Sequence, residues 1–505
     1  MEHISGQQSH RLFNTAATRA LEQLTAAQFP PHVLMQRAGL AVARLALALA
    51  PHARKVWIAC GPGNNGGDGL EAAMHLQQWR KAPLVTWLGD EASAPADALL
   101  SLARARAAGV EFLAHAPSDL DQNDLCIDAL LGIGSTRALQ GHMAELTKQL
   151  NASAAAVLAV DVPTGLDGDT GDFSGADSEG ATHENALSGL AVRARDTLTL
   201  LTLKPGLFTG NGRDTAGEVW FDDLAVDDAS VACTATLLGL PVGRTRLHAS
   251  HKGSFGDVAL IGGAAGMTGA ALLAASAALH AGAGRVYVAL LDRNGITLDT
   301  AQPELMFRDF NNLDLKGMTV LCGCGGGEEV RAALPRVLAQ PSALVLDADA
   351  LNAIAKDEQL QTLLRSRGHR GRTTVLTPHP LEASRLLACN TFEVQVNRLR
   401  AAQKLADHFH CTVVLKGSGT VIAAPGLTPA INPTGNARLA TAGTGDVLAG
   451  MIGAGLASGL PAFSAACAAV YRHGALADSW PVGIPLTASR LATRSAPQFA
   501  RNLAT

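Results

Sequence analysis

The fold is decided by the stretch Gly-Pro-Gly-Asn-Asn-Gly-Gly-Asp-Gly at residues 61–69. It follows an apolar run at 55–60, which predicts a buried strand, and precedes a run at 70–76 that predicts the opening of a helix. A glycine turn between a strand and a helix N-terminus leaves backbone N–H groups unpaired, and the helix dipole favours negative charge beside them. Glycines also let the backbone approach a ligand closely. The stretch therefore predicts an anion-binding cradle suited to a phosphate group.

The bulk composition is that of a compact globular protein. A chain of 505 residues exceeds one ordinary hydrophobic core, so two or more domains are expected. A hydrophobic content of 48% with 17% charged residues excludes the disordered class. The net charge of −4 gives no sign of the basic face that nucleic-acid-binding proteins carry, so we expect no nucleic-acid partner.

Cysteine usage and the apolar runs bear on the compartment. The eight cysteines are scattered, and the nearest pair, Cys322 and Cys324, lacks the spacing of a zinc site. Reduced thiols and a polar N-terminus without an apolar signal segment predict a cytoplasmic protein. The uncharged run at 447–471 is long enough for a membrane span, but Gly459-Leu460-Pro461 interrupts it. We interpret it as two close-packed helices of a domain core, and expect no membrane partner.

Strand-like and helix-like runs alternate along the chain, which predicts the α/β class with two open domains. Nearly continuous apolar runs are typical of parallel strands that helices cover on both faces. They occur in the first half at 55–60, 84–88, 125–128 and 156–161, and in the second at 258–261, 286–290, 320–322, 344–346, 375–376 and 413–415. Helix-like runs at 268–281 and 392–410 fall between the latter. We expect the join near 225–245 and an exposed excursion at 168–190.

The glycine stretch has a simple alternative interpretation. Its first, third and sixth residues satisfy G-x-G-x-x-G, and Asp90 lies about as far downstream as the acidic residue of a dinucleotide-binding redox domain. That motif alone is weakly specific. Asn64, Asn65 and Asp68 add amide and carboxylate oxygens that simple pyrophosphate binding does not require.

Oxygen-bearing side chains also follow two further predicted strands. Asp128 ends one of them, and Asp161 with Thr164 ends the next. The carboxyl ends of parallel strands converge on one crevice, so these groups can meet there. Ligand sets made only of oxygen suit a hard cation.

The glycine stretch, the motif Val-Asp-Val-Pro-Thr-Gly at 160–165 and the segment Leu-Met-Gln-Arg-Ala-Gly at 34–39 resemble the YjeF N-terminal family, over roughly residues 10–225. The resemblance implies a Rossmann-like three-layer α/β/α domain, residues 1–235, that epimerises R- and S-NADHX and NADPHX, the hydrated nicotinamide dinucleotides, at C6. It implies potassium (K⁺) bound by Asn65, Asp128 and Thr164, where many members have Ser in place of Thr164, and a catalytic Asp161. It assigns the hydrate to Asn64, Asn65, Gly66, Gly67, Asp68, Gly132, Ile133, Gly134, Ser135, Thr136, Arg137, Ala138 and Asp161.

The second half carries another glycine-rich helix N-terminus. Gly-Thr-Gly-Asp at 443–446 predicts an anion hole for a transferring phosphoryl group. Asp446 beside it can take the proton of a substrate hydroxyl, as the base of a kinase-type site does. A lysine and a glycine turn at 416–420, a histidine and a carboxylate at 377–382, and two acids at 347–352 each follow a predicted strand.

These clusters, with His-Lys-Gly-Ser-Phe-Gly at 251–256 and the glycine-rich segments 262–271 and 323–326, resemble the ribokinase-like ADP-dependent NAD(P)HX dehydratase family over roughly residues 245–500. The resemblance implies a three-layer α/β/α domain, residues 236–505, that dehydrates S-NAD(P)HX to NAD(P)H with ADP and Mg²⁺, giving AMP and phosphate. It makes Asp446 the catalytic base. It assigns ADP to Lys416, Gly417, Ser418, Gly419, Thr420 and Gly445, and the hydrate to Ala270, Gly325, Gly326, His379 and Asp446.

Two departures from that family's pattern affect loops. Asn-Ala-Arg-Leu at 436–439 replaces the usual Asn-Pro-Gly-Met, and Ala442 replaces a common glycine. Neither removes Asp446, but we expect the loop that bears Arg438 to close differently.

The favoured hypothesis is a bifunctional repair enzyme whose substrates are NADHX, NADPHX and ADP, and family habit suggests a homo-oligomer. Two alternatives stay open. One is a ribokinase-like kinase for a vitamin-precursor alcohol fused to a regulatory domain, which would leave a stable phosphorylated product. The other makes the first half a binding module only, as in relatives that serve RNA-decay assemblies. The residues alone do not distinguish ADP from ATP, or NADHX from NADPHX.

Overall fold

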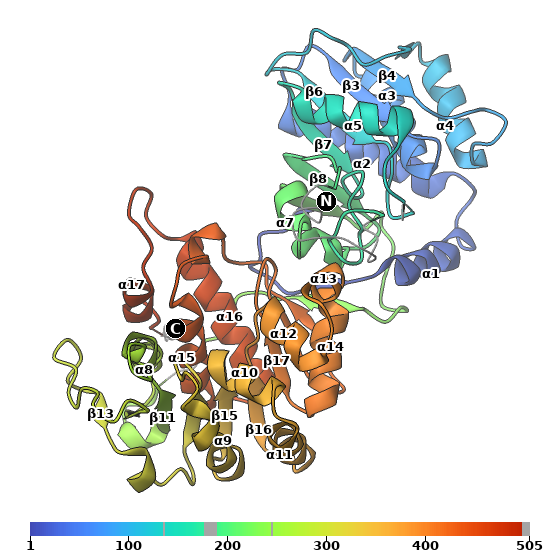
Figure 1. Ribbon diagram of the computed structural model, residues 1–505. Coiled ribbons are helices and arrows are strands. Elements are labelled where there is room, and N and C mark those ends of the chain that lie inside the picture. The colour runs from blue at the N-terminus through green and yellow to red at the C-terminus, as the bar shows by residue number, and fades with distance from the viewer. Residues whose placement is uncertain (135–136, 176–188, 244–245, 497–505) are drawn as a thin grey trace. The chain divides into compact units, whose positions relative to one another are not determined.

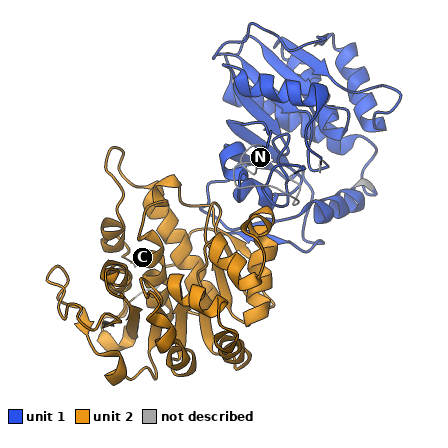
Figure 2. Cartoon of the chain, viewed as in Figure 1, with its two compact units in different colours: residues 1–237 blue, residues 238–505 orange. Residues whose placement is uncertain are grey.

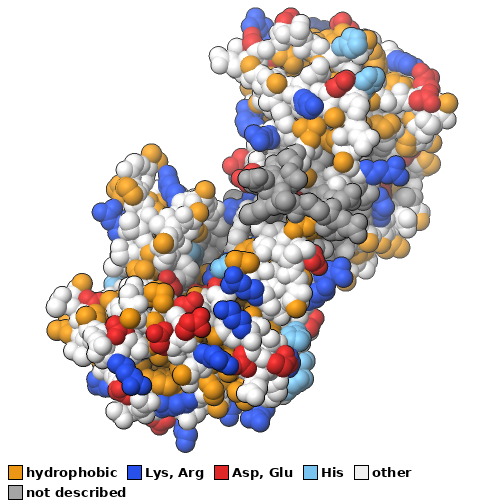
Figure 3. Space-filling model, in the orientation of Figure 1, with side chains coloured by type: hydrophobic (Ala, Val, Ile, Leu, Met, Phe, Trp, Pro, Cys, Tyr) orange, Lys and Arg blue, Asp and Glu red, His pale blue; other side chains and the backbone are white. Residues whose placement is uncertain are grey.

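The computed structural model describes residues 1–134, 137–175, 189–243 and 246–496. The chain divides into two compact units, Met1–Leu237 and Leu238–Thr505 (Figures 1 and 2). On the face drawn in Figure 3, Lys and Arg side chains are interspersed with Asp and Glu on both units. Each unit has its own parallel sheet, as the alternating runs of the sequence predict.

Unit 1 is built on an eight-stranded sheet in the order β1-β9-β8-β7-β6-β3-β4-β5. Its strands from β9 to β5 run parallel, and β1 pairs antiparallel with β9 at the edge. The strands are β1 (Glu2–His3), β3 (Val56–Cys60), β4 (Pro83–Trp87), β5 (Glu111–Phe112), β6 (Leu125–Ala129), β7 (Ala156–Val160), β8 (Asp196–Leu200) and β9 (Glu218–Asp222). Outside this eight-stranded sheet, β2 (His10–Leu12) pairs antiparallel with β10 (Ala235–Leu237). The four strands predicted in this half are confirmed to within one residue.

Helices cover both faces of this sheet. They are α1 (Thr15–Ala26), α2 (Val33–Leu49), α3 (Asn64–Gln78), α4 (Ala96–Ala107), α5 (Gly141–Ala152) and α7 (Gly212–Thr215), with a 3-10 helix η1 (Pro205–Phe208). Alternate residues of β3 show the two faces: Ile58 and Cys60 pack in the core formed with α2 and α3, whereas Trp57 packs with Leu146 and Leu150 of α5. The three-layer α/β/α arrangement follows.

Unit 2 carries strands in the order β13-β12-β11-β14-β15-β16-β17-β18-β19. They run parallel from β13 to β17, and β18 and β19 complete the run antiparallel. The strands are β11 (Asp257–Gly262), β12 (Arg285–Leu290), β13 (Met306–Phe307), β14 (Thr319–Cys322), β15 (Ala343–Leu346), β16 (Thr373–Leu376), β17 (Thr412–Leu415), β18 (Val421–Ala423) and β19 (Ala430–Ile431). The six strands predicted in this half are all present.

Two hydrophobic cores flank this second sheet, one formed mainly by α8, α15, α16 and α17 and the other by α9 to α14. The helices are α8 (Thr268–His280), α9 (Val330–Ala339), α10 (Ala348–Ala355), α11 (Glu358–His369), α12 (Pro380–Leu387), α13 (Thr391–Val396), α14 (Arg398–Phe409), α15 (Thr444–Ala457), α16 (Ala462–Asp478) and α17 (Ala488–Thr493). Short 3-10 helices are η2 (Lys252–Phe255), η3 (Phe310–Asn312) and η4 (Ala437–Leu439).

The uncharged run at 447–471 forms two helices, α15 and α16, as predicted. Their glycines and alanines allow close packing, because a Cβ on Gly450 would lie 2.2 Å from the carbonyl oxygen of Ala274 in α8. Within the described ranges, no helix has both the length and the apolar character needed to cross a membrane.

Two local predictions are wrong, and a third can be compared with the structure only in part. The expected loop at 61–69 ends at Gly63, since α3 already begins at Asn64. The run at 392–410 is two helices rather than one, because Asn397 leaves the helical region and caps α14 through Arg400 N. In the expected excursion at 168–190, residues 176–188 lie outside the described ranges, and the part before them is packed: a Cβ on Gly171 would lie 2.1 Å from the carbonyl oxygen of Thr209.

Candidate active sites

A cavity of about 510 Å³ opens at the carboxyl ends of the central strands of unit 1. Its walls come from α1, the beginnings of α2 and α3, and the loops that follow β6, β7 and β8. Of the residues predicted to hold the hydrate, it is lined by Asn64, Asn65, Asp68, Gly132, Ile133, Gly134 and Asp161. The topology therefore brings most of the predicted dinucleotide-binding residues to one pocket.

Gly66 and Gly67 do not line this cavity, although the sequence assigns them to the ligand. They lie in the first turns of α3, where a Cβ would be 2.0 Å from Gly61 O or 2.7 Å from Met35 Sδ. Their glycine character thus serves packing within the protein. A Cβ on Gly63, by contrast, would meet no described atom within 4 Å, so this is where the stretch is open to a ligand.

The remaining predicted residues follow the loop after β6. Arg137 and Ala138 are exposed and do not line the cavity. Ser135 and Thr136 lie outside the described residues.

Asp128, at the end of β6, is fully buried and tied to the loop after β7. Its carboxylate accepts hydrogen bonds from the backbone N–H of Thr164 at 2.8 Å and from the Thr164 hydroxyl at 2.7 Å. Burial raises the pKa of Asp128 to about 6. Among the described residues no Lys or Arg forms an ion pair with it. Two of the three predicted potassium ligands therefore lie in direct contact.

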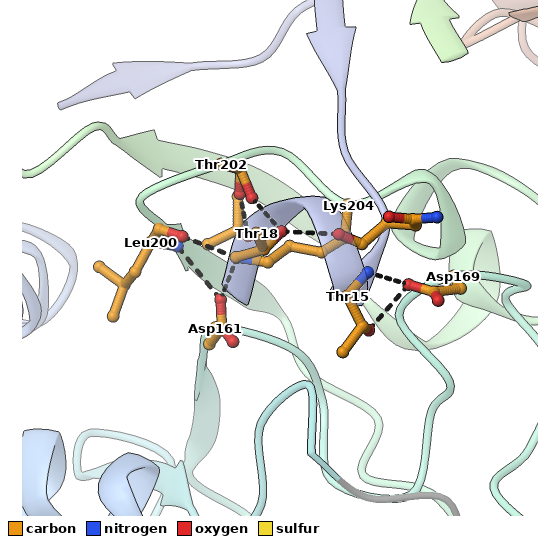
Figure 4. Close-up of polar contacts among 9 residues, drawn as sticks. Thr15, Thr18, Asp161, Asp169, Leu200, Thr202 and Lys204 are labelled. Carbon is orange, nitrogen blue, oxygen red and sulfur yellow. Dashed lines mark hydrogen bonds and ion pairs between the residues drawn. The ribbon is translucent and has the colours of Figure 1, made fainter. Parts of the chain in front are cut away.

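Asp161 follows β7 with its backbone in the left-handed region, at φ 67°. Non-glycine residues adopt that region at a cost, and such residues cluster at functional sites. One carboxylate oxygen, Oδ1, accepts a hydrogen bond from Lys204 Nζ at 2.5 Å, and the same ammonium donates to Leu200 O at 2.7 Å (Figure 4). The other oxygen faces the loop after β6, where a Cβ on Gly132 would lie 3.1 Å from Asp161 Oδ2 and 3.3 Å from Asn65 Oδ1.

Two features of this pocket escaped the sequence analysis. Lys204, only 1% exposed, is the ammonium that holds Asp161, and a lysine within the apolar segment 198–208 was the available signal. The amide nitrogen Nδ2 of Asn65 is buried and has no hydrogen-bond partner among the described residues. A buried polar atom without a partner costs free energy, so it marks a place where a ligand can bind.

In unit 2, Asp446 lies in the first turn of α15, close to Cys324 and Asp347. One ligand atom from each of the three side chains lies within 4.8 Å of the others. The Cys324 thiol lies beside the Asp446 carboxylate, and this contact lowers the pKa of Asp446. Burial, followed by the charge of Asp347, raises the pKa of Asp446 to about 6. A carboxylate whose pKa lies near neutrality is suited to act as a general base.

Lys416, at the end of β17, reaches the same cluster. Its Nζ donates to Asp347 Oδ1 at 2.7 Å, and a Cβ on Gly445 would lie 3.5 Å from this ammonium. Arg398, which the sequence analysis missed, is buried and donates to the carbonyl of Lys416 at 3.1 Å. Gly417 has φ 135° and leaves room for the guanidinium, because a Cβ there would lie 2.8 Å from Arg398 Nη2. Arg398 therefore holds the backbone of the turn that is predicted to bind ADP.

Only some of the residues predicted to contact the hydrate in unit 2 lie next to one another. A Cβ on Gly325 would lie 3.0 Å from Ala270 Cβ, so the loop after β14 and the first turn of α8 touch. Gly326, the next residue of that loop, bonds through its N–H to Gly323 O at 3.0 Å. His379 caps α12, with Nδ1 accepting from Leu381 N at 3.2 Å, and its Nε2 lies 3.2 Å from Glu382 Oε1. Burial raises the pKa of Glu382 to about 7.

The loop that departs from the family pattern closes onto α16 and its continuation. Asn436 accepts from Arg438 N at 3.1 Å and donates to Asp478 Oδ1 at 2.9 Å. The Arg438 guanidinium donates to the carbonyl of Trp480 at 2.9 Å. Arg438 thus fixes the loop that leads into the N-terminus of α15.

Comparison with known proteins assigns both units. Residues 31–206 match the family described as YjeF-related protein N-terminus, and residues 258–493 match the family described as NAD(P)H-hydrate dehydratase. The chain is 35% identical over 465 residues to the bifunctional NAD(P)H-hydrate repair enzyme Nnr of Escherichia coli, covering 88% of this chain and 84% of that protein.

Two further relatives and one solved structure are similar to parts or most of the chain. The Nnr of Coxiella burnetii is 32% identical over 483 residues, covering 92% of this chain and 94% of that protein. The ADP-dependent (S)-NAD(P)H-hydrate dehydratase of Neisseria meningitidis is 42% identical over 270 residues, covering 52% of this chain and 90% of that protein. A solved ADP/ATP-dependent NAD(P)H-hydrate dehydratase of Bacillus subtilis is 31% identical, with a TM-score of 0.42 over 50% of this chain and 91% of that chain. The chain belongs to the family of bifunctional NAD(P)H-hydrate repair enzymes.

Proposed function

We propose that the two units repair one damaged cofactor in sequence. Residues 1–235 interconvert R- and S-NAD(P)HX, and residues 236–505 dehydrate the S form to NAD(P)H while ADP is converted to AMP and phosphate. The observation that carries this proposal is the match of both units to relatives named for NAD(P)H-hydrate repair. The two acid–base clusters, one around Asp161 and one around Asp446, support it.

In unit 1 we assign acid–base chemistry at C6 to Asp161. Lys204 holds one of its oxygens in place and leaves Oδ2 directed toward the loop that contains Gly132. The hydrate is assigned to the cavity and its neighbourhood, through Asn64–Asp68 and Gly132–Ala138. The open backbone at Gly63 supports this placement, because the pyrophosphate can approach the N-terminus of α3 there.

The residues around Asp128 fit a potassium ion. A buried carboxylate without an ion-pair partner among the described residues favours a bound cation, since an uncompensated buried charge is costly. Asp128, the Thr164 hydroxyl and the Asn65 amide oxygen are hard oxygen donors, which suit K⁺. We assign these three residues to it. Bound there, the ion would supply fixed positive charge beside the dinucleotide.

In unit 2 we assign the base to Asp446. It takes the proton of the C6 hydroxyl while that oxygen attacks the terminal phosphorus of ADP and AMP leaves. Loss of phosphate from C6 and of a proton from C5 then restores the nicotinamide. Lys416–Thr420 and Gly445 are assigned to ADP, whose Mg²⁺ would meet the carboxylates of Asp347 and Asp446. Ala270, Gly325, Gly326 and His379 are assigned to the hydrate.

A direct test follows the two epimers separately. We expect R-NADHX with ADP and Mg²⁺ to yield NADH faster than spontaneous epimerisation allows, with AMP and free phosphate as products. A stable phosphorylated product would indicate a kinase instead. We further propose a cytoplasmic homo-oligomer without a nucleic-acid partner; this rests on the sequence alone, and light scattering of the purified chain tests the oligomer.

A further inference from the structure

A second carboxylate reaches the cavity of unit 1 from a different wall than Asp161. Thr18, Arg19 and Glu22 of α1 line it, whereas Asp161 enters it from the end of β7. Positions 18 and 22 lie on one face of a helix, because residues four apart stack along it. Leu21, beside them, is buried in the core of unit 1 and fixes the rotation of the helix.

α1 is held in this place by its own hydrogen bonds. Thr15 donates through its backbone N–H, at 2.6 Å, and through its hydroxyl, at 2.8 Å, to Asp169 (Figure 4). Thr18 and Thr202 bond hydroxyl to hydroxyl at 2.8 Å, two residues before Lys204. Arg19 reaches across to the loop after β6, where a Cβ on Gly134 would lie 3.5 Å from its Nη2. The helix therefore forms a fixed wall of the pocket.

The pocket holds more carboxylates than cations that can neutralise them at short range. The carboxylates of Glu22, Asp68, Asp97 and Asp161 line it, whereas its cations are Arg19 and Lys204, and the ammonium of Lys204 bonds to Asp161. Burial, followed by the charge of Asp161, raises the pKa of Glu22, while Lys204 and Arg19 lower it and Asp97 raises it. Burial, followed by the charges of Asp161, Glu22 and Glu71, raises the pKa of Asp68 well above its ordinary value, while Lys204 lowers it.

This arrangement separates the roles of the acids. Lys204 holds one oxygen of Asp161, and a neighbour whose pKa is raised keeps its proton more readily, which is how paired acids divide acid and base work. A general acid must reach its substrate, which favours Glu22, whose partly exposed side chain lines the cavity from α1, over Asp68, which lies in the first turns of α3.

We propose that Glu22 is the second acid–base residue of the epimerase and serves the face of the nicotinamide ring opposite to Asp161. The proposal rests on the function proposed above for unit 1. Neither the family resemblance nor the relatives' names assign this residue a role.

The proposed step balances in atoms and charge. Glu22 gives its proton to the C6 hydroxyl, the C6–O bond breaks with its electron pair on the departing water, and the N1 lone pair forms an N1=C6 double bond. Another water then attacks C6 from the opposite face, the N1=C6 pair returns to N1, and Asp161 takes the proton from that water. One water is lost and one is gained, with inversion at C6. The reverse conversion uses the two residues in exchanged roles.

The test measures epimerisation of R-NADHX without ADP by chiral chromatography, on the full chain. Loss of a general acid costs roughly 100-fold or more in kcat. We expect that loss in Glu22→Gln, with KM changed less than about threefold and the fall of kcat at high pH abolished. Glu145→Gln, an exposed carboxylate on α5, should behave as the wild type. Urea unfolding followed by tryptophan fluorescence, which reports mainly on unit 1 because four of the five tryptophans lie there, shows that each variant is folded.

Two results would overturn the proposal. One is Glu22→Gln with kcat within about threefold of the wild type while Asp68→Asn loses it, which would make Asp68 the acid. The other is epimerisation in H₂¹⁸O without uptake of ¹⁸O at C6, since inversion by ring opening keeps the original oxygen. If the wild type itself fails to exceed the spontaneous rate, the proposed function fails rather than the role of Glu22.

Discussion

Lys204 Nζ lies 2.5 Å from Asp161 Oδ1, and the lysine side chain is 1% exposed. This pair joins the end of β7 to the segment after β8, and it leaves one carboxylate oxygen free to face the cavity. Removing one member of a buried ion pair leaves the other charge without a partner in the protein interior, which destabilises the folded state.

Lys204→Met should therefore destabilise unit 1 by roughly 3–5 kcal/mol. Urea unfolding followed by tryptophan fluorescence measures this, because four of the five tryptophans, Trp57, Trp79, Trp87 and Trp220, lie in unit 1. Lys55→Met, in the exposed pair with Asp119, should cost only ~0–1 kcal/mol. Adding Asp161→Asn to Lys204→Met should recover part of the loss. Equal costs for the two lysines would show that the Lys204–Asp161 pair is not buried.

Cys324 should influence the pKa of Asp446, the base of the dehydratase. The contact with its thiol lowers the pKa of Asp446, so Cys324→Ala should raise that pKa. We expect the acid limb of the kcat profile to move up by up to about one pH unit, slowing the reaction at pH 6 while leaving it nearly unchanged at pH 8. Cys324→Ser keeps a donor and should behave like the wild type. Identical profiles for the alanine and serine variants would contradict this role of the thiol.

The raised pKa of Asp446, about 6, sets a second pH dependence. The base must be ionised, so dehydration should fall as the pH drops through about 6. The same raised pKa has the opposite effect on stability. The folded state binds this proton more tightly than the unfolded chain does, so the free energy of unfolding falls as the pH rises through the folded pKa of about 6. Asp446→Asn should thus abolish dehydration and stabilise unit 2 at pH 8 by ~1–2 kcal/mol after solvent screening. A destabilised, inactive variant would argue that Asp446 is structural.

The potassium assignment predicts an ion-specific effect in unit 1. Epimerisation should be faster in potassium chloride than in tetramethylammonium chloride at equal ionic strength. Thr164→Val removes a ligand oxygen and a hydrogen bond to Asp128, so the difference between the two salts should disappear. Thr164→Ser keeps the hydroxyl and should preserve it. Wild-type rates that are equal in both salts would contradict the assignment.

Two glycines of the first motif, Gly63 and Gly66, should differ in how much an alanine substitution changes stability and substrate binding. Gly63→Ala meets open space at φ −100°, so its stability should change by less than about 1 kcal/mol, while KM for the hydrate rises. Gly66→Ala drives a Cβ to 2.0 Å from Gly61 O and should cost roughly 3 kcal/mol or more. Thermal unfolding and epimerase kinetics of the two variants check this. Equal destabilisation would show that the motif is needed for packing alone.

Most of the sheet architecture could be predicted from apolar runs, because strands buried on both faces leave a simple hydrophobic signal. The edge strands β1 and β5 have only two residues each, so no apolar run in the sequence marks them. The start of α3 was misplaced because glycine disfavours helices in general, whereas here tight packing against the carbonyl of Gly61 outweighs that preference.

The sites were partly predictable for a similar reason. Asp128, Asp161 and Asp446 follow strands or open a helix, so their positions can be read from local order. Lys204 and Arg398 act by reaching residues far from them in the sequence, and no local pattern reveals such a contact.

The measurement that tests the account most directly is NADH formation from pure R-NADHX with ADP, Mg²⁺ and potassium, compared between the wild type, Asp161→Asn and Asp446→Asn. The account predicts fast NADH formation by the wild type. It predicts formation limited to the spontaneous epimerisation rate in Asp161→Asn, and conversion to a mixture of epimers without NADH in Asp446→Asn. Undiminished NADH formation from R-NADHX by Asp161→Asn, or any ADP-driven NADH formation by Asp446→Asn near the wild-type rate, would contradict it.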